Sequence, residues 1–203
     1  MRRRFCFERQ ADAEVTEGRA GMSGKGFSIV FSSRTGNTAE LAEAVREALP
    51  EGTCEYFGSV DGDAGAGCGR TSSAIPASET LFVGFWTNQG VADQAAQKLL
   101  GQLRNRKIFL FGTAGFGGSE AYFQAILGKT KAFIDDSNTV IGTYMCQGKM
   151  PLSVRERYVK MKEQPDHMPN IDAMIENFDK ALAHPDADDL VKLANLVSEA
   201  IEQ

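Results

Sequence analysis

Five short apolar runs recur along the chain, and they constrain its fold more than any other feature of the sequence. β-Branched and aromatic residues dominate these runs, and most are bounded by glycine, serine or asparagine, as strands commonly are. The runs span residues 27–31, 53–57, 81–86, 108–111 and 140–146. Their near-continuous apolar character is typical of strands that helices cover on both faces. Helical periodicity follows the first, third and fourth runs, so the sequence predicts an α/β fold with one five-stranded parallel sheet.

The connection between the second and third runs departs from this pattern. Residues 61–78 are rich in glycine, alanine and serine and carry no apolar stripe, although a parallel crossover is required there. We expect either a short irregular helix or an extended loop of high mobility.

Residues 151–203 contain no further strand-like run but three amphipathic helical stretches. Ser153 and Glu156 have the spacing of a capping box at the start of the first stretch, and Pro185 opens the third. We expect one of these helices to complete the last crossover and the others to pack on the flank of the domain. A separate partner-docking module is the alternative.

The first 21 residues show neither periodicity nor the apolar segment of a targeting signal. We expect a flexible arm, or the product of an upstream start, because a second methionine, Met22, stands just before the first predicted strand. A basic arm that touches membrane or RNA is the alternative. The length of 203 residues then predicts one domain over residues 22–203, with residues 151–203 as its helical elaboration.

Composition excludes several classes of protein. A net charge of −5 argues against a chain that collects nucleic-acid phosphates, and no run approaches the roughly 18 apolar residues of a membrane span. Two histidines and four widely spaced cysteines favour neither a metal site nor a disulfide scaffold. Sparse, unpatterned cysteine is usual in reducing compartments, so we expect a cytoplasmic protein with no membrane or nucleic-acid partner.

The most informative segment joins the first predicted strand to the first predicted helix. Ser33, Thr35 and Thr38 offer hydroxyl donors there, and Gly36 permits close approach of the backbone. The helix that follows presents unpaired N–H groups and a partial positive charge at its start. The segment lacks both the GxxxxGK[ST] and the GxGxxG spacing. It therefore predicts a site for a single terminal monophosphate.

Residues 29–38, with the sequence IVFSSRTGNT, resemble the FMN-phosphate signature of the flavodoxin family. The resemblance covers roughly residues 25–160 and implies a flavodoxin-like three-layer sandwich with strand order 2-1-3-4-5. It also implies FMN as the cofactor, bound at the carboxyl ends of the strands beside the switch point of the sheet. The phosphate would then lie on the loop after the first strand, formed by Ser33, Arg34, Thr35, Gly36, Asn37 and Thr38.

The same resemblance places the isoalloxazine ring over the loops after the third and fourth predicted strands. Trp86, the only tryptophan, could stack on the ring or close the core, and Gly90 is the candidate for the peptide near flavin N5. Lys149 could approach the flavin or a partner, or lie in solvent. The ring-site residues predicted on the two loops are Trp86, Thr87, Asn88, Gly90, Thr113, Ala114, Gly115, Phe116 and Gly117.

No set of side chains has the pattern of an acid–base or nucleophilic catalyst, so we predict no catalytic residue and no metal ligand. The flavin itself would carry the redox step. We expect an electron carrier, a monomer or homodimer, that works between a reductase and an acceptor protein. The alternatives are an NAD(P)H-dependent FMN or quinone reductase and a flavin-binding or partner-docking module. Residues 22–150 hold eleven basic and twelve acidic residues, little of the acidic excess that lowers a flavin's potential.

Overall fold

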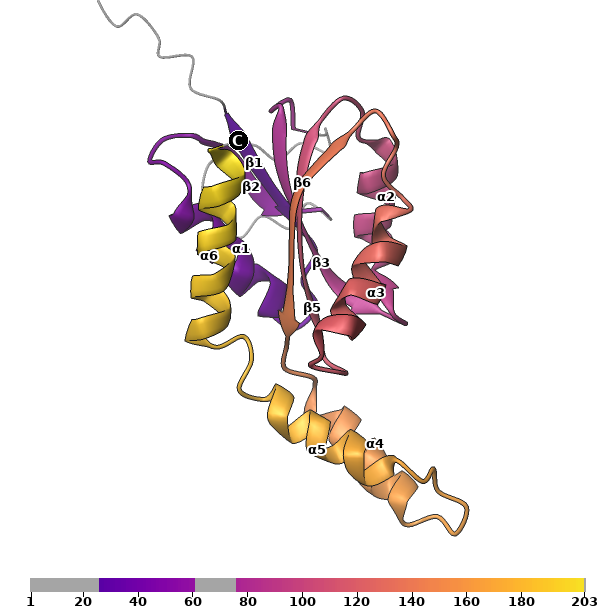
Figure 1. Cartoon of the computed structure of the whole chain (residues 1–203). Coiled ribbons are helices and arrows are strands. Elements are labelled where there is room, and N and C mark those ends of the chain that lie inside the picture. The colour runs from indigo at the N-terminus through magenta and orange to yellow at the C-terminus, as the bar shows by residue number, and fades with distance from the viewer. Residues whose placement is uncertain (1–25, 61–75, 203) are drawn as a thin grey trace, which may run out of the picture.

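The structure, a computed structural model that describes residues 26–60 and 76–202, is built around one sheet (Figure 1). Its parallel strands pair in the order β2-β1-β3-β5-β6, which confirms the predicted order. These strands are β1 (Phe27–Phe31), β2 (Cys54–Ser59), β3 (Thr80–Asn88), β5 (Lys107–Ala114) and β6 (Thr139–Gln147). The predicted arm over residues 1–21 and the connection over residues 61–75 lie outside the described residues.

The sheet has six strands rather than the predicted five, because β4 (Val91–Ala92) turns back onto β3. The two strands pair antiparallel, with Asn88 opposite Val91. Gln89 and Gly90 form the two-residue turn between them, and both have positive φ, 52° and 79°. That combination is the requirement of a type I′ hairpin, in which glycine at the second position relieves the strain. A two-residue strand is too short to show periodicity, so it could not be predicted from the apolar pattern.

Helices cover both faces of the sheet, as the predicted three-layer sandwich requires (Figure 1). Helices α1 (Asn37–Ala48) and α6 (Ala187–Ile201) share one apolar cluster with Phe82 and Phe109. Helices α2 (Gln94–Gln102) and α3 (Glu120–Lys131) share the other with Phe85. Each fully buried phenylalanine or leucine contributes about 1.5–3 kcal/mol to the free energy of folding. The core therefore lies in two layers, one on each side of the strands.

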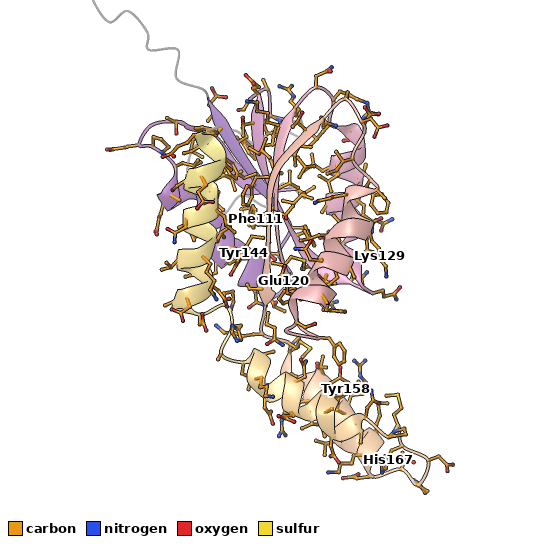
Figure 2. The ribbon with its side chains drawn as sticks, viewed as in Figure 1. Phe111, Glu120, Lys129, Tyr144, Tyr158 and His167 are labelled. Carbon is orange, nitrogen blue, oxygen red and sulfur yellow. The ribbon has the colours of Figure 1, made fainter. Side chains whose placement is uncertain are left out.

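Two of the three tail helices are predicted to pack on the flank of the sheet. Helices α4 (Leu152–Lys162) and α5 (Ile171–Ala181) do not pack there. They form a hairpin that extends beyond the carboxyl ends of the strands (Figure 1). Arg155 pairs with Asp179 at 2.7 Å and Lys162 pairs with Asp172 at 2.6 Å, so the start of one helix meets the end of the other. In Figure 2, Tyr158 lies along this hairpin and His167 lies at its tip.

Two predicted helix starts also differ from the structure. Ser153 and Glu156 form no capping box, because α4 begins at Leu152, two residues before the start that a Ser153 N-cap would give, and its N-cap is Pro151. The third tail helix begins at Ala187 rather than at Pro185, and Asp186 and Asp189 supply its capping box. No helix among the described residues is long and apolar enough to cross a bilayer.

A buried polar network anchors α6 to β6. The Tyr144 hydroxyl donates to Asp189 Oδ1 at 3.2 Å, and His184 Nδ1 lies 2.6 Å from Asp189 Oδ2. Burial raises the pKa of Tyr144 far above its usual range, and the nearby Asp189 carboxylate adds to this effect, so the hydroxyl stays a donor. His184, Asp186 and Asp189 each place one potential metal-ligand atom within 4.8 Å of the others. The small number of histidines in the sequence did not predict this grouping.

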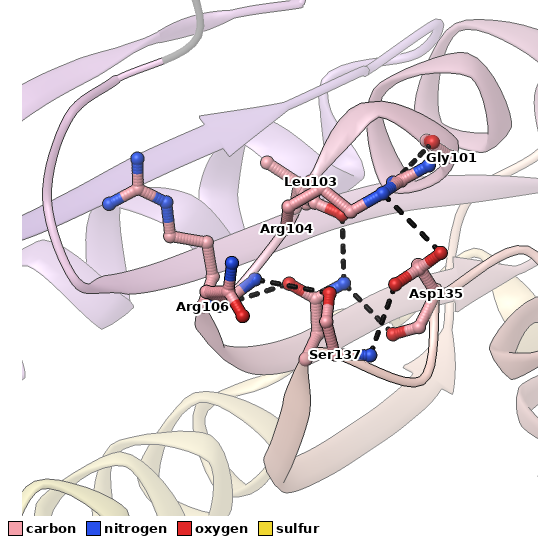
Figure 3. A network of polar contacts seen from close by, with 8 residues as sticks. Gly101, Leu103, Arg104, Arg106, Asp135 and Ser137 are labelled. Atoms are coloured by element: carbon pink, nitrogen blue, oxygen red, sulfur yellow. Dashed lines mark hydrogen bonds and ion pairs between the residues drawn. The ribbon is translucent and has the colours of Figure 1, made fainter.

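A second polar network closes the opposite, amino-terminal edge of the sheet (Figure 3). Arg104 pairs with Asp135 at 3.3 Å, and the Ser137 hydroxyl accepts the Asn105 N–H. The Asn138 side-chain amide donates to the carbonyls of Leu103 and Asp135 at 2.9 and 3.0 Å. These bonds join the loop before β5 to the loop before β6.

Candidate functional site

A cavity of about 670 Å³ lies at the carboxyl ends of the parallel strands. Its volume is within the range of about 300–1,000 Å³ that is usual for sites of small molecules and cofactors. The loops after β1, β3 and β5, the segment after β6 and one side of α4 line it. Ten of the fifteen predicted site residues are among its lining: Arg34, Thr35, Asn37, Trp86, Thr87, Gly90, Thr113, Ala114, Gly115 and Phe116.

The loop after β1 reaches α1 through Gly36, which has a φ of 89° and is the N-cap of the helix. Asn37 follows it, and its side-chain amide donates to Thr35 Oγ1 and to the Lys149 carbonyl, both at 2.9 Å. Ser33 Oγ accepts the N–H of Ala39 at 3.2 Å. These bonds hold the loop against the start of a helix, where free N–H groups and the helix dipole favour an anion.

Two hydroxyls of the signature are used inside the core instead of in the cavity. Ser32 is buried and donates to the Asp93 carboxylate, which also caps α2. Thr38 is buried, and its Oγ1 lies 3.3 Å from the Phe85 carbonyl and 3.1 Å from Thr113 Oγ1. The Thr38 hydroxyl therefore ties α1 to β3 and β5. Ser33, Gly36, Thr38, Asn88 and Gly117 do not line the cavity.

Aromatic side chains form the walls of the cavity beside β3 and β5. Trp86 is half-buried, and the Arg34 guanidinium carbon lies 5.4 Å from the centre of its ring. Phe116 is 44% exposed at the mouth and meets Tyr122 edge-on, with ring centres 6.2 Å apart. Such rings offer flat apolar surfaces to a planar ligand.

Two features of the lining suit a ligand that fills the cavity. Thr87 Oγ1 is buried and has no hydrogen-bond partner among the described residues, which is costly unless a ligand or water supplies one. The backbone at Gly148 lies so close to Asn37 that a Cβ there would stand 2.6 Å from its Nδ2. The segment after β6 can therefore approach the phosphate loop only through a glycine.

Helix α4 forms a wall of the cavity that the sequence analysis did not predict. Its contribution is Ser153, Val154, Arg157 and Tyr158. The apolar periodicity of this helix marked it as amphipathic, but periodicity says nothing about where a helix stands relative to a distant sheet edge. The other lining residues that were not predicted as site residues are Gln89, Tyr122, Gly148, Lys149, Met150 and Pro151.

The lining of the cavity is positively charged. Among the described residues, the lining includes Arg34, Lys149 and Arg157 but no aspartate or glutamate, although the whole chain has a net charge of −5. Burial raises the pKa of Tyr122, so this phenol adds no negative charge at neutral pH. The cavity is therefore suited to a planar, anionic ligand, and the residues present fit the phosphate and the ring of a flavin mononucleotide.

Comparison with known proteins identifies relatives over most of the chain. The flavodoxin domain model matches residues 28–198. The flavodoxin-like domain-containing protein BilS of Clostridium symbiosum is 39% identical over 183 residues, which cover 86% of this chain and 95% of that protein. The protein of the same name from Clostridioides difficile is 28% identical over 163 residues, which cover 80% of this chain and 88% of that protein.

Solved structures with a similar arrangement are more distant in sequence. A Fusobacterium nucleatum flavodoxin bound to flavin mononucleotide is 12% identical, with a TM-score of 0.47 over 88% of this chain and 95% of that chain. A Lactobacillus acidophilus flavoprotein in complex with FMN is 14% identical, with a TM-score of 0.44 over 60% of this chain and 93% of that chain. Because the domain model spans most of the sequence and the sheet has the predicted order, the chain belongs to the flavodoxin family.

Proposed function

We propose that the chain binds FMN in the 670 Å³ cavity and carries electrons between a reductase and an acceptor protein. The observation that carries the proposal is the position of the signature loop, which lines this cavity directly before the first turn of α1. Bound FMN would supply the one- and two-electron chemistry, and the protein would supply binding, orientation and electrostatics.

The phosphate would bind at the loop after β1. Arg34 and Thr35 line the cavity there, and the helix dipole adds a partial positive charge at Asn37. A dianionic phosphate gains about 1.5–3 kcal/mol from each hydrogen bond that a donor makes to it. This part of the cavity would therefore account for much of the affinity.

The ring would lie between the loops after β3 and β5. Trp86 and Phe116 offer aromatic faces or edges there, and Thr87 offers a hydroxyl that lacks a partner among the described residues. The turn at Gln89 and Gly90 supplies backbone with positive φ at the same edge. Each of these groups can orient a flavin without reacting with it.

The lining supports a carrier rather than an acid–base enzyme. Among the described residues around the cavity, none is a histidine, cysteine, aspartate or glutamate, the residues that most often transfer protons or attack a substrate. The alternative is an NAD(P)H-dependent FMN or quinone reductase. The observation that favours this alternative is the number of cations in the lining: three are present, which is more than the single phosphate group of FMN requires.

Reduction of the reconstituted protein separates the two functions. The chain is loaded with FMN and mixed with NADH or NADPH under anaerobic conditions, while its visible absorbance is followed. A carrier keeps its yellow colour for minutes and bleaches only when a reductase is added. Rapid bleaching by the nucleotide alone, followed by recovery of colour with a quinone, would favour the reductase.

A further inference from the structure

We propose that one stripe of α4 docks the acidic face of the protein that exchanges electrons with the flavin. The stripe consists of Ser153, Arg157 and Lys160, which follow one another at helical spacing along one side of α4, and Gln164 continues it just beyond the end of the helix. The inference rests on the proposed electron-carrier function and names the kind of partner that it requires.

The basic residues of α4 divide into two sets. Arg155 and Lys162 face α5, where they pair with the carboxylates of Asp179 and Asp172. Arg157 and Lys160 are exposed on the other side and form no ion pair with any described residue. The cations that face α5 are therefore paired within the hairpin, whereas the cations on the opposite side of α4 are available to another molecule.

The stripe is continuous with the candidate flavin site. Ser153 and Arg157 line the large cavity and also a neighbouring hollow of about 420 Å³, whose other lining includes Lys160 and Gln164. Within the part of the chain that the structure describes, Glu156 is the single carboxylate that lines this hollow. A partner that covers the stripe would thus stand directly beside the cavity, as electron transfer requires.

Charge and apolar exposure together favour a protein partner. Leu152 is 65% exposed and Val159 is 36% exposed on the same helix, and Phe116 is exposed at the cavity mouth. Apolar side chains beside arginine are typical of protein interfaces, and opposite charges around them speed association. Since the cations here belong to α4 and the cavity lining, the complementary partner is a small redox protein with an acidic face.

Binding of an acidic ferredoxin to the full chain tests the proposal. Affinity is measured by calorimetry at about 0.01 M and about 0.15 M salt, with and without FMN, because the Debye length falls from about 30 to about 8 Å over this range. We expect the ferredoxin to bind roughly tenfold more weakly at the higher salt. Lys160→Glu should weaken binding several-fold at low salt, Arg157→Glu/Lys160→Glu should weaken it further, and both should flatten the salt dependence.

A control makes the same change of charge elsewhere. Lys98→Glu/Lys131→Glu reverses two exposed cations on α2 and α3, outside both hollows, and should change the affinity less than twofold. Ferredoxin affinity that is unchanged in the α4 variants, or lost equally in the control, would overturn the proposal. So would a several-fold loss of NADPH affinity in Lys160→Glu with ferredoxin affinity intact. The FMN-free measurement still decides docking if the chain takes up no flavin, which would refute only the proposed cofactor.

Discussion

The side-chain amide of Asn37, in the first turn of α1, donates a hydrogen bond of 2.9 Å to the backbone carbonyl of Lys149, 112 residues further along the chain. The Lys149 N–H in turn donates to the His184 carbonyl at 3.1 Å, beside the start of α6. These two bonds join the phosphate loop to the segment around Lys149, which leads from β6 into the α4–α5 hairpin. They also join it to the segment around His184, which leads from the hairpin back to α6.

Replacing Asn37 by alanine should loosen both walls of the cavity. The variant loses the bonds to Thr35 Oγ1 and to the Lys149 carbonyl. We therefore expect the free energy of unfolding to fall by about 1–3 kcal/mol and FMN to bind more weakly. Urea unfolding and fluorescence titration with FMN measure the two effects. Asn138→Ala is the control at the opposite end of the sheet, where the Asn138 side chain donates to the carbonyls of Leu103 and Asp135 and accepts the Arg106 N–H. It should lower the free energy of unfolding at least as much and leave FMN affinity unchanged.

Ser33 and Thr38 should differ in what their hydroxyls contribute. Thr38→Ala removes buried bonds to Phe85 and Thr113, so we expect it to lower the free energy of unfolding by about 1–3 kcal/mol. Ser33→Ala removes a half-buried acceptor for the Ala39 N–H and should lower mainly FMN affinity. Denaturation and flavin titration of both single variants separate these effects. Unchanged flavin affinity in the double variant would contradict the assignment of the phosphate loop.

Trp86 and Arg34 should affect different parts of the cofactor. Trp86→Ala removes an aromatic wall and should weaken both FMN and riboflavin, by about 1–3 kcal/mol if the ring stacks on it. Arg34→Ala should weaken FMN but not riboflavin, because riboflavin has no phosphate. Titration of both variants with both ligands gives the comparison. Equal losses of the two ligands in Arg34→Ala would place this arginine at the ring.

The cations of the cavity should raise the reduction potential of the bound flavin. Nearby positive charge stabilises the negative charge that reduction adds, so Lys149→Gln and Arg157→Gln should each lower the midpoint potential. Dye equilibration of the FMN-loaded variants measures the shift. Lys98→Gln removes an exposed cation on α2 and should leave the potential unchanged. A potential that does not fall in either cavity variant would show that these cations lie too far from the ring.

The sheet could be predicted from the sequence because local patterns determine it. Each of the five apolar runs lies within a parallel strand or overlaps it, and the glycine and hydroxyl residues after β1 mark the loop that lines the cavity. Trp86 was correctly expected at the carboxyl end of β3, where alternation of side chains puts Phe85 in the core.

The rest depends on contacts between distant segments, which local patterns do not encode. The local sequence predicts the Thr38 hydroxyl as a ligand donor. Its partners in the structure, Phe85 and Thr113, lie on distant strands, so the sequence around Thr38 could not reveal them. The α4 wall was missed because ion pairs with α5 and the path of the chain after Pro151 decide its position. The capping box predicted at Ser153 does not form, because Pro151, two residues earlier, is already the N-cap of α4.

Calorimetric titration of the purified full chain with FMN, read together with its visible absorbance, tests the central claim most directly. We expect saturable binding at one site per chain, a yellow product, and a clear loss of heat in the Arg34→Ala variant. A chain that releases no heat with FMN and stays colourless under every reconstitution condition would contradict the assignment of the cavity to a flavin.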